Sequence, residues 1–136
     1  MTRINVVSVS ELSDQHLIAE YHELPRVLKQ DINIADAPDK YCLGKGHMKW
    51  AKRHFIFTAK RWGEIITEMR NRGFYTNPNY DNVDWVPASW CLPINDYQPD
   101  NTDIELNRRR IREKYQMKPD WYRWTKRTKP DWLEGE

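Results

Sequence analysis

The stretch SDQHLIAEYHELPRVLKQD, residues 13–31, decides the fold class. Apolar side chains recur in it at the i, i+4, i+7, i+11 spacing of one helix face, at Leu17, Tyr21, Leu24 and Leu28. Ser13 is a suitable N-cap, because its hydroxyl can accept a hydrogen bond from a free backbone N–H of the first turn. Pro25 removes one interior hydrogen bond, so we expect a kink there. The pattern predicts an amphipathic helix with a buried stripe.

A second helix is predicted to run from Thr58, as its cap, to Arg72. Gly73 follows at the position where a left-handed residue commonly ends a helix. The side chains at core spacing are Trp62, Ile65, Ile66 and Met69.

A third helix is predicted to open with a capping box formed by Thr102 and Glu105 and to end before Pro119. Its inward residues are Ile104, Ile111 and Tyr115. Residues 74–101 before it contain four prolines and form a long irregular connection, pinned by Trp85 and Trp90. We therefore expect an all-α fold: a compact single domain over residues 1–136, with three main helices, long irregular loops and an aromatic, basic C-terminal tail.

The composition points to a folded cytoplasmic protein. Aromatic residues make up 12% of the 136 residues, although hydrophobic residues make up only 39%. No apolar run approaches the roughly 18 residues of a membrane span, and the start lacks the layout of a signal peptide. Cys42 and Cys91 match no zinc or redox spacing, which favours two reduced thiols.

Basic residues are concentrated in two stretches, although the net charge is only +2. Residues 45–72 hold eight Lys and Arg against two acidic residues, and residues 104–129 hold ten against three. Residues 73–103 hold five Asp and no Lys or Arg. Such segregation favours a basic face for a polyanion, most commonly DNA or RNA. Two merely exposed basic helices are the alternative explanation.

A polar stripe on the first predicted helix is the first candidate for chemistry. It lies almost opposite the apolar stripe and consists of Gln15, His22 and Arg26, flanked by His16 and Glu23. The common catalytic motifs, such as the Walker loop, the GxSxG elbow and the HExxH zinc motif, do not occur in the sequence.

Both ends of the chain contain further candidate functional residues. If Met1 is removed, Thr2 presents an α-amine with a reference pKa of about 7.7 to 8.0, which makes it a ready imine former. In the C-terminal tail, the run WYRWTKR at residues 121–127 alternates aromatic rings with cations, which suits base stacking combined with phosphate contact. The alternative is that these rings pack back onto the helices. Some rings can contact DNA while others pack in this way.

The N-terminal block MTRINVVSVSELSDQHLIAEYHELPRV, residues 1–27, resembles the pyrimidine-dimer DNA glycosylases of the phage endonuclease V type. Further blocks agree in the same order, namely LGKGH at 43–47, RGF at 72–74, DYQP at 96–99 and PDWY at 119–122. The resemblance implies a compact helical protein of three main helices, with its N-terminus at a DNA interface.

The resemblance also implies a mechanism. In the family, the amine matching Thr2 attacks C1′ of the damaged nucleotide and forms a Schiff base, and β-elimination follows. The carboxylate matching Glu23 stabilises the cationic intermediate and moves protons. The implied partner is double-stranded DNA that contains pyrimidine dimers or abasic sites, from which one nucleotide is flipped. No metal or cofactor is implied, and we expect a monomer.

The expected DNA-binding residues combine the resemblance with the residue patterns and are Arg3, Gln15, His16, His22, Arg26, Arg110, Lys114, Trp121, Tyr122, Arg123 and Trp124. Two positions depart from the family. His22 stands where its best-known member has arginine, which removes a fixed charge. The run WYRWTKR replaces a tyrosine-rich segment tied to dimer recognition. The alternatives are therefore the same lyase chemistry on another damaged base, or a noncatalytic DNA-binding module.

Overall fold

The computed structural model describes residues 4–30, 32–86 and 95–134. These residues form four α-helices, which are α1 (Asp14–Leu28), α2 (His47–Arg53), α3 (Phe55–Asn71) and α4 (Asn101–Met117). Short 3-10 turns accompany them at η1 (Val9–Glu11), η2 (Pro78–Tyr80) and η4 (Asp131–Leu133). The predicted all-α class is confirmed, with three long helices and the short α2.

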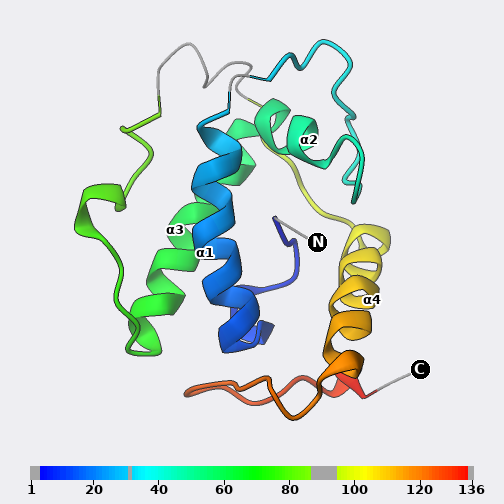
Figure 1. Cartoon of the computed structure of the whole chain (residues 1–136). Coiled ribbons are helices and arrows are strands. Elements are labelled where there is room, and N and C mark those ends of the chain that lie inside the picture. The colour runs from blue at the N-terminus through cyan, green and yellow to red at the C-terminus, as the bar shows by residue number, and fades with distance from the viewer. Residues whose placement is uncertain (1–3, 31, 87–94, 135–136) are drawn as a thin grey trace.

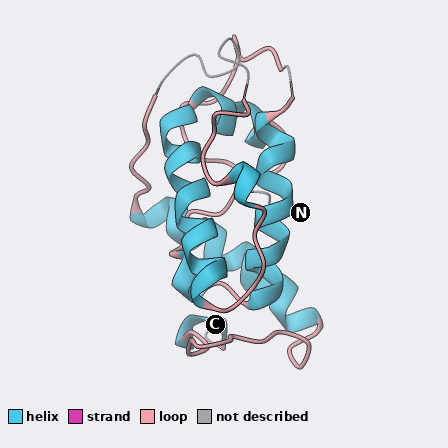
Figure 2. Ribbon diagram, turned by 90° about the vertical axis from the view of Figure 1, so that its left-hand side faces the viewer, coloured by secondary structure: helices cyan, strands magenta, loops and turns pink. Residues whose placement is uncertain are grey.

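Helix α1 is the central element of the fold (Figure 1). Helix α3 packs alongside it, α4 stands on its other side, and residues 4–8 pass between α1 and α4 (Figure 1). The C-terminal tail runs across the end of the molecule where α1 begins, and the turned view shows it crossing below the upright helices (Figure 2). No helix in the described ranges is long and apolar enough to cross a membrane.

Helix α1 begins where its sequence predicts. Ser13 is the N-cap, and its Oγ accepts a hydrogen bond from the His16 N–H at 3.0 Å. The partly buried Tyr21 stacks on Trp62 of α3, with 5.2 Å between ring centroids. The helix continues through Pro25, so the kink expected there stays a prediction. The rest of the predicted stripe is fully buried, at Leu17, Leu24 and Leu28.

The second predicted helix begins at a different residue in the structure than the sequence predicts. Thr58 lies inside α3, which begins at Phe55, so the predicted N-cap role is wrong. Its hydroxyl instead donates to the Ala51 carbonyl at 2.8 Å. Helix α2 precedes α3 and was not predicted, and the backbone of His54, at φ −102° and ψ 57°, divides the two. Gly73 has φ +88°, which confirms the left-handed stop.

Helix α4 opens with a capping box, but not the predicted one. Asp100 accepts a hydrogen bond from the Asp103 N–H at 2.8 Å, and Asp103 accepts one from the Asp100 N–H at 3.1 Å. Asp is the stronger N-cap residue, and this pair leaves Thr102 and Glu105 exposed in the first turns of the helix. The helix ends two residues before Pro119, as predicted.

Candidate nucleic-acid interface

A hollow of about 300 Å³ lies between α1, α4 and the C-terminal tail. It brings together residues that lie in three separate segments of the sequence, namely Gln15 and His16, Arg110 and Lys114, and Trp121 and Tyr122. Sequence reasoning missed the remaining lining, which is Asn5, Ala19 and Ile111. Six of the predicted DNA-binding residues therefore share one hollow.

His16 forms one wall of this hollow as a neutral ring. Its ring is parallel to that of Tyr122, with centroids 4.9 Å apart and planes 6° apart. Its Nδ1 lies 2.8 Å from the Ser13 Oγ. Burial lowers the pKa of His16 to about 4, because a charged imidazole would lose its hydration there. His16 therefore supplies shape and stacking near pH 7 rather than positive charge.

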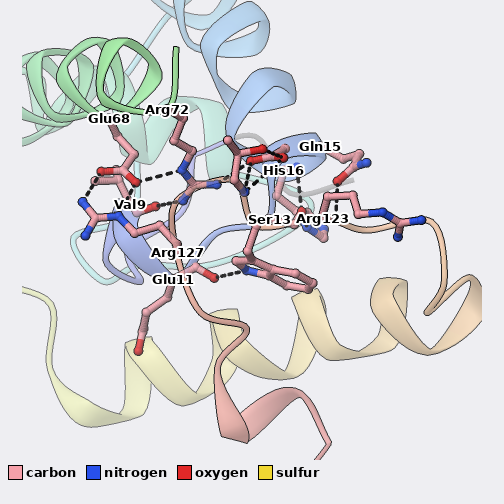
Figure 3. Close-up of polar contacts among 12 residues, drawn as sticks. Val9, Glu11, Ser13, Gln15, His16, Glu68, Arg72, Arg123 and Arg127 are labelled. Carbon is pink, nitrogen blue, oxygen red and sulfur yellow. Dashed lines mark hydrogen bonds and ion pairs between the residues drawn. The ribbon is translucent and has the colours of Figure 1, made fainter. Parts of the chain in front are cut away.

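Gln15 ties the tail to the start of α1 (Figure 3). Its Nε2 donates to the Trp121 carbonyl at 2.8 Å, and its Oε1 accepts from the Arg123 N–H at 3.0 Å. The Arg123 side chain is exposed and pairs with no carboxylate among the described residues. Gln15 thus holds the tail backbone, which leaves the Arg123 guanidinium at the surface.

The tail is anchored further along by carboxylates of α1 and α3. Asp14 accepts hydrogen bonds from the Thr125 N–H at 3.1 Å and from the Thr125 hydroxyl at 2.6 Å. Arg127 makes two bonds of 2.8 Å to Glu68, which also binds Arg72 (Figure 3). The alternative in which the tail packs back onto the helices is therefore correct for this part of the chain.

Some aromatic rings of the tail pack onto the helices, and others are exposed for contact with a ligand. Trp124 is partly buried, and its Nε1 donates to the Glu11 carbonyl at 3.0 Å. Tyr122 packs against His16. Trp121 is 57% exposed at the edge of the hollow. Of the three, Trp121 has the most surface for contact with a ligand.

Glu23 lies one helical turn after Ala19, on the side of α1 that borders this hollow. Its side chain is 18% exposed, and its Oε1 lies 3.8 Å from the Arg26 Nη1. The segment that carries Asn5 lies against the same helix, because Asn5 binds Glu20, three residues before Glu23. Thr2 and Arg3, which the sequence also singled out, lie outside the described residues.

A larger hollow, of about 670 Å³, lies on the other side of α1, toward α3 and the loop that follows it. His22 and Arg26 line it from α1. Its aromatic walls are Tyr21, Trp62, Phe74, Tyr75 and Tyr80. Helix α1 thus separates two hollows, with Gln15 and His16 facing the smaller one and His22 and Arg26 facing the larger one.

A family model described as pyrimidine dimer DNA glycosylase matches residues 1–82, which is more than half of the chain. The chain belongs to this glycosylase family. The family acts in DNA repair on pyrimidine dimers. The matched region of this glycosylase contains α1, α2 and α3, so the polar stripe of α1 falls inside it, whereas α4 and the tail lie beyond it. Among its described residues, no three His, Cys, Asp or Glu side chains are grouped to hold a metal ion.

The glycosylase presents its basic charge on α4 and the tail more than on residues 45–72. Three cations of that earlier stretch are buried, at Lys52, Arg61 and Arg72. Four more are paired with aspartates, at Lys49, Arg53, Lys60 and Arg70. In α4 and the tail, six cations form no ion pair with a described residue, namely Arg109, Arg110, Lys114, Lys118, Arg123 and Lys126. Of the two basic stretches, the second supplies the largely uncompensated surface among the residues that the structure describes.

Proposed function

We propose that this protein is a bifunctional DNA glycosylase and abasic-site lyase that acts on pyrimidine dimers in duplex DNA. Thr2 supplies the nucleophile through its α-amine after removal of Met1, and Glu23 is the acid–base partner. The observation that carries the proposal is the pairing of Asn5 with Glu20, which holds the N-terminal segment against the helix that carries Glu23. Asn5 is bound to Glu20, one turn before Glu23, and Thr2 precedes Ile4 by two residues, a chain length of at most about 7 Å.

The chemistry needs a neutral amine, and an α-amine provides one near pH 7 more readily than a lysine does. The amine bonds to C1′ as the bond between C1′ and the damaged base breaks, and the base leaves with the electron pair. The C1′–O4′ bond then opens as one of the two protons on the attached amine passes to O4′, which leaves a protonated Schiff base. The Glu23 carboxylate stabilises this cation and accepts the C2′ proton. Loss of that proton expels the 3′ phosphate, and water hydrolyses the imine to release Thr2.

Binding to the duplex uses the two hollows and the cations around them. Arg110, Lys114 and Arg123 contact phosphates beside the smaller hollow, where Trp121 offers a stacking surface. His16, Tyr122 and Trp124 hold the shape of that surface, and Gln15 holds the tail backbone. Arg3 adds a phosphate contact next to Thr2.

The larger hollow receives the flipped nucleotide. Its walls offer tyrosine rings for stacking, at Tyr75 and Tyr80, and its rim carries the cations Arg26 and Lys29 for the adjoining phosphates. His22 lies at this rim, where arginine in the family would add a fixed charge. Flipping out a base costs less free energy when its pairing is already weakened by a distorted dimer. Damaged DNA is therefore favoured over undamaged DNA.

The test is borohydride trapping on three duplexes, one with a single cyclobutane thymine dimer, one abasic and one undamaged. We expect a covalent adduct on the first two duplexes, mapped to Thr2 by mass spectrometry. Glu23→Gln should abolish adduct formation and leave DNA affinity nearly unchanged. Glu64→Gln, which alters an exposed carboxylate on α3, is the matched control and should trap normally.

The other results separate the remaining alternatives. An adduct on the abasic duplex alone would keep the amine chemistry and assign a different damaged base. No adduct on any duplex, with DNA binding intact, would make the protein a noncatalytic DNA-binding module. Equal trapping by Glu23→Gln and the wild type would overturn the role of Glu23.

A further inference from the structure

Residues 4–7 are buried between the helices, and their backbone is held by side chains instead of by a neighbouring strand. Each of the four N–H groups donates to a side-chain acceptor. The Ile4 N–H binds the His47 Nε2 at 3.0 Å, and the Asn5 N–H binds the Glu20 Oε2 at 3.2 Å. The next two N–H groups share the Asn107 Oδ1, at 2.8 Å from Val6 and 3.1 Å from Val7.

The carbonyl groups and the Asn5 side chain are held in the same way. The Ile4 carbonyl accepts from the Tyr41 hydroxyl at 3.0 Å, and the Val7 carbonyl accepts from Arg61 at 2.6 Å. The Asn5 amide donates to Glu20 at 2.7 Å and accepts from Asn107 at 2.8 Å. The acceptors and donors therefore come from all four helices and, through Tyr41, from the loop before α2.

Several polar groups are buried in order to hold these few residues. The side chains of Glu20 and Arg61 form an ion pair at 2.8 Å and are only 1% and 3% exposed. Removing such a pair from water is costly, and apolar side chains of similar size would often be at least as stable. Asn107 is fully buried at a position where α4 has an apolar stripe. These polar side chains satisfy the buried backbone N–H groups of residues 4–7, which an apolar interior would leave without hydrogen-bond partners.

The hydrogen bonds fix the register of the segment. Each backbone group meets one particular partner, and a slip by one residue would move every group by up to about 3.5 Å and break all of these bonds. His47 is itself held in one tautomer, because its Nδ1 donates to the Cys42 carbonyl at 2.7 Å, so that its Nε2 is left to accept from Ile4.

We infer that Asn107, His47 and the Glu20–Arg61 pair are positioning residues that lock the N-terminal segment in register with Glu23. The inference rests on the proposed function, in which the Thr2 amine must reach a defined point beside Glu23. Glu20 and Glu23 belong to the same helix, so fixing Asn5 on Glu20 fixes the segment relative to Glu23 as well.

Asn107→Leu tests this inference. The change keeps the approximate volume and removes the acceptor of two backbone N–H groups. At saturating abasic duplex, we expect the single-turnover trapping rate to fall by about 100-fold, since a misplacement near 1 Å has that effect on a reaction rate. The dissociation constant for a duplex with a non-cleavable abasic analogue should stay within about threefold of wild type, because the phosphate contacts that dominate affinity lie elsewhere.

Two other variants keep the test decisive. Asn107→Asp retains the acceptor for Val6 and Val7 but loses the donor to the Asn5 Oδ1 and buries a charge, so it should recover only part of the trapping rate. Asn5→Ala removes only side-chain bonds, so it should fold even where Asn107→Leu does not, and its trapping rate should fall. Thr58→Val is the control, because it removes a buried hydrogen bond between α3 and α2 that does not involve residues 4–7.

The outcomes distinguish this inference from the proposed function. A wild-type protein that forms no adduct overturns the proposed function, and the positioning role with it. A wild-type protein that forms the adduct while folded Asn107→Leu or Asn5→Ala forms it at the same rate overturns the inference alone. Loss of trapping in Thr58→Val, corrected for the folded fraction, to the same degree as in Asn107→Leu would also overturn it, since the role would then be purely structural.

Discussion

The rings of His16 and Tyr122 lie parallel, with centroids 4.9 Å apart and planes 6° apart, although 106 positions separate them in the chain. This stack joins the first turn of α1 to the tail that follows α4. Because the hollow lined by Arg110 and Lys114 is closed on one side by these two rings, the tail forms part of the candidate interface.

Burial of the His16 ring makes the free energy of unfolding depend on pH. The pKa of His16 is lowered to about 4 in the folded state, whereas the unfolded chain binds the proton below about 6.5. Between these two values the unfolded state holds more protons, so stability falls as pH decreases from 6.5 to 4 and is fully present above 6.5. The loss amounts to at most about 3 kcal/mol.

Urea unfolding of wild type and His16→Asn across this pH range measures that contribution. The difference in unfolding free energy between the two proteins should change with pH from 6.5 to 4 and be constant above it. His22→Asn is the control, because it makes the same replacement at an exposed histidine of the same helix. Identical slopes for wild type and His16→Asn would contradict the neutral, buried state of His16.

Trp121 and Trp124 should respond in opposite ways to replacement by alanine. Trp121 is exposed at the edge of the hollow, so Trp121→Ala should weaken DNA binding by about 5- to 100-fold, the range of one lost base stack, and leave the melting temperature nearly unchanged. Trp124 packs against Tyr115 and binds the Glu11 carbonyl, so Trp124→Ala should destabilise the protein by about 2 kcal/mol. Thermal melts and fluorescence anisotropy measure the two effects, and the reverse pattern would contradict this division of the tail.

The two basic stretches should differ in how they affect the salt dependence of binding. Each cation that contacts a phosphate contributes about −0.9 to the slope of log affinity against log salt. Arg110→Ala and Lys114→Ala should therefore each make the slope shallower by about 0.9. Lys60→Ala should leave the slope unchanged, because Lys60, on α3, is paired with Asp96. An equal effect of all three replacements would restore a role for residues 45–72 in the basic face.

Local features explain why most of the helical fold was predictable. The cap at Ser13 and the stripe from Leu17 to Leu28 interact within a few turns of one helix, so their spacing in the sequence is sufficient. Helix α2 has no such signal, because it is only seven residues long and its N-cap, Gly46, makes no side-chain hydrogen bond. That helix is held by tertiary packing, chiefly of the buried Trp50, which one sequence does not reveal.

Six of the eleven predicted DNA-binding residues line the smaller hollow, but the division of the α1 stripe between two hollows was not predictable. Helical spacing placed Gln15, His22 and Arg26 on one stripe. Gln15 instead faces the hollow toward α4, whereas His22 and Arg26 face the hollow toward α3. The buried polar residues left a weak signal, since Asn107 lies three residues after Ile104 and four before Ile111, on the predicted inward face. Its partners, Val6 and Val7, lie about a hundred positions away and are not identifiable from spacing.

An extra residue before Thr2 should abolish Schiff-base formation. Because Ile4 and Asn5 are held in register by His47 and Glu20, the added residue cannot be absorbed by sliding the segment. It displaces the amine by up to about 3.5 Å instead, and a misplacement of even 1 Å costs about 100-fold in rate. Protein with a glycine placed before Thr2, compared with protein carrying the same glycine after Glu136, should lose trapping on abasic duplex while both forms bind the duplex equally. An N-terminally extended form that traps at the normal rate would contradict the claim that the register of residues 4–7 sets the position of the reacting amine.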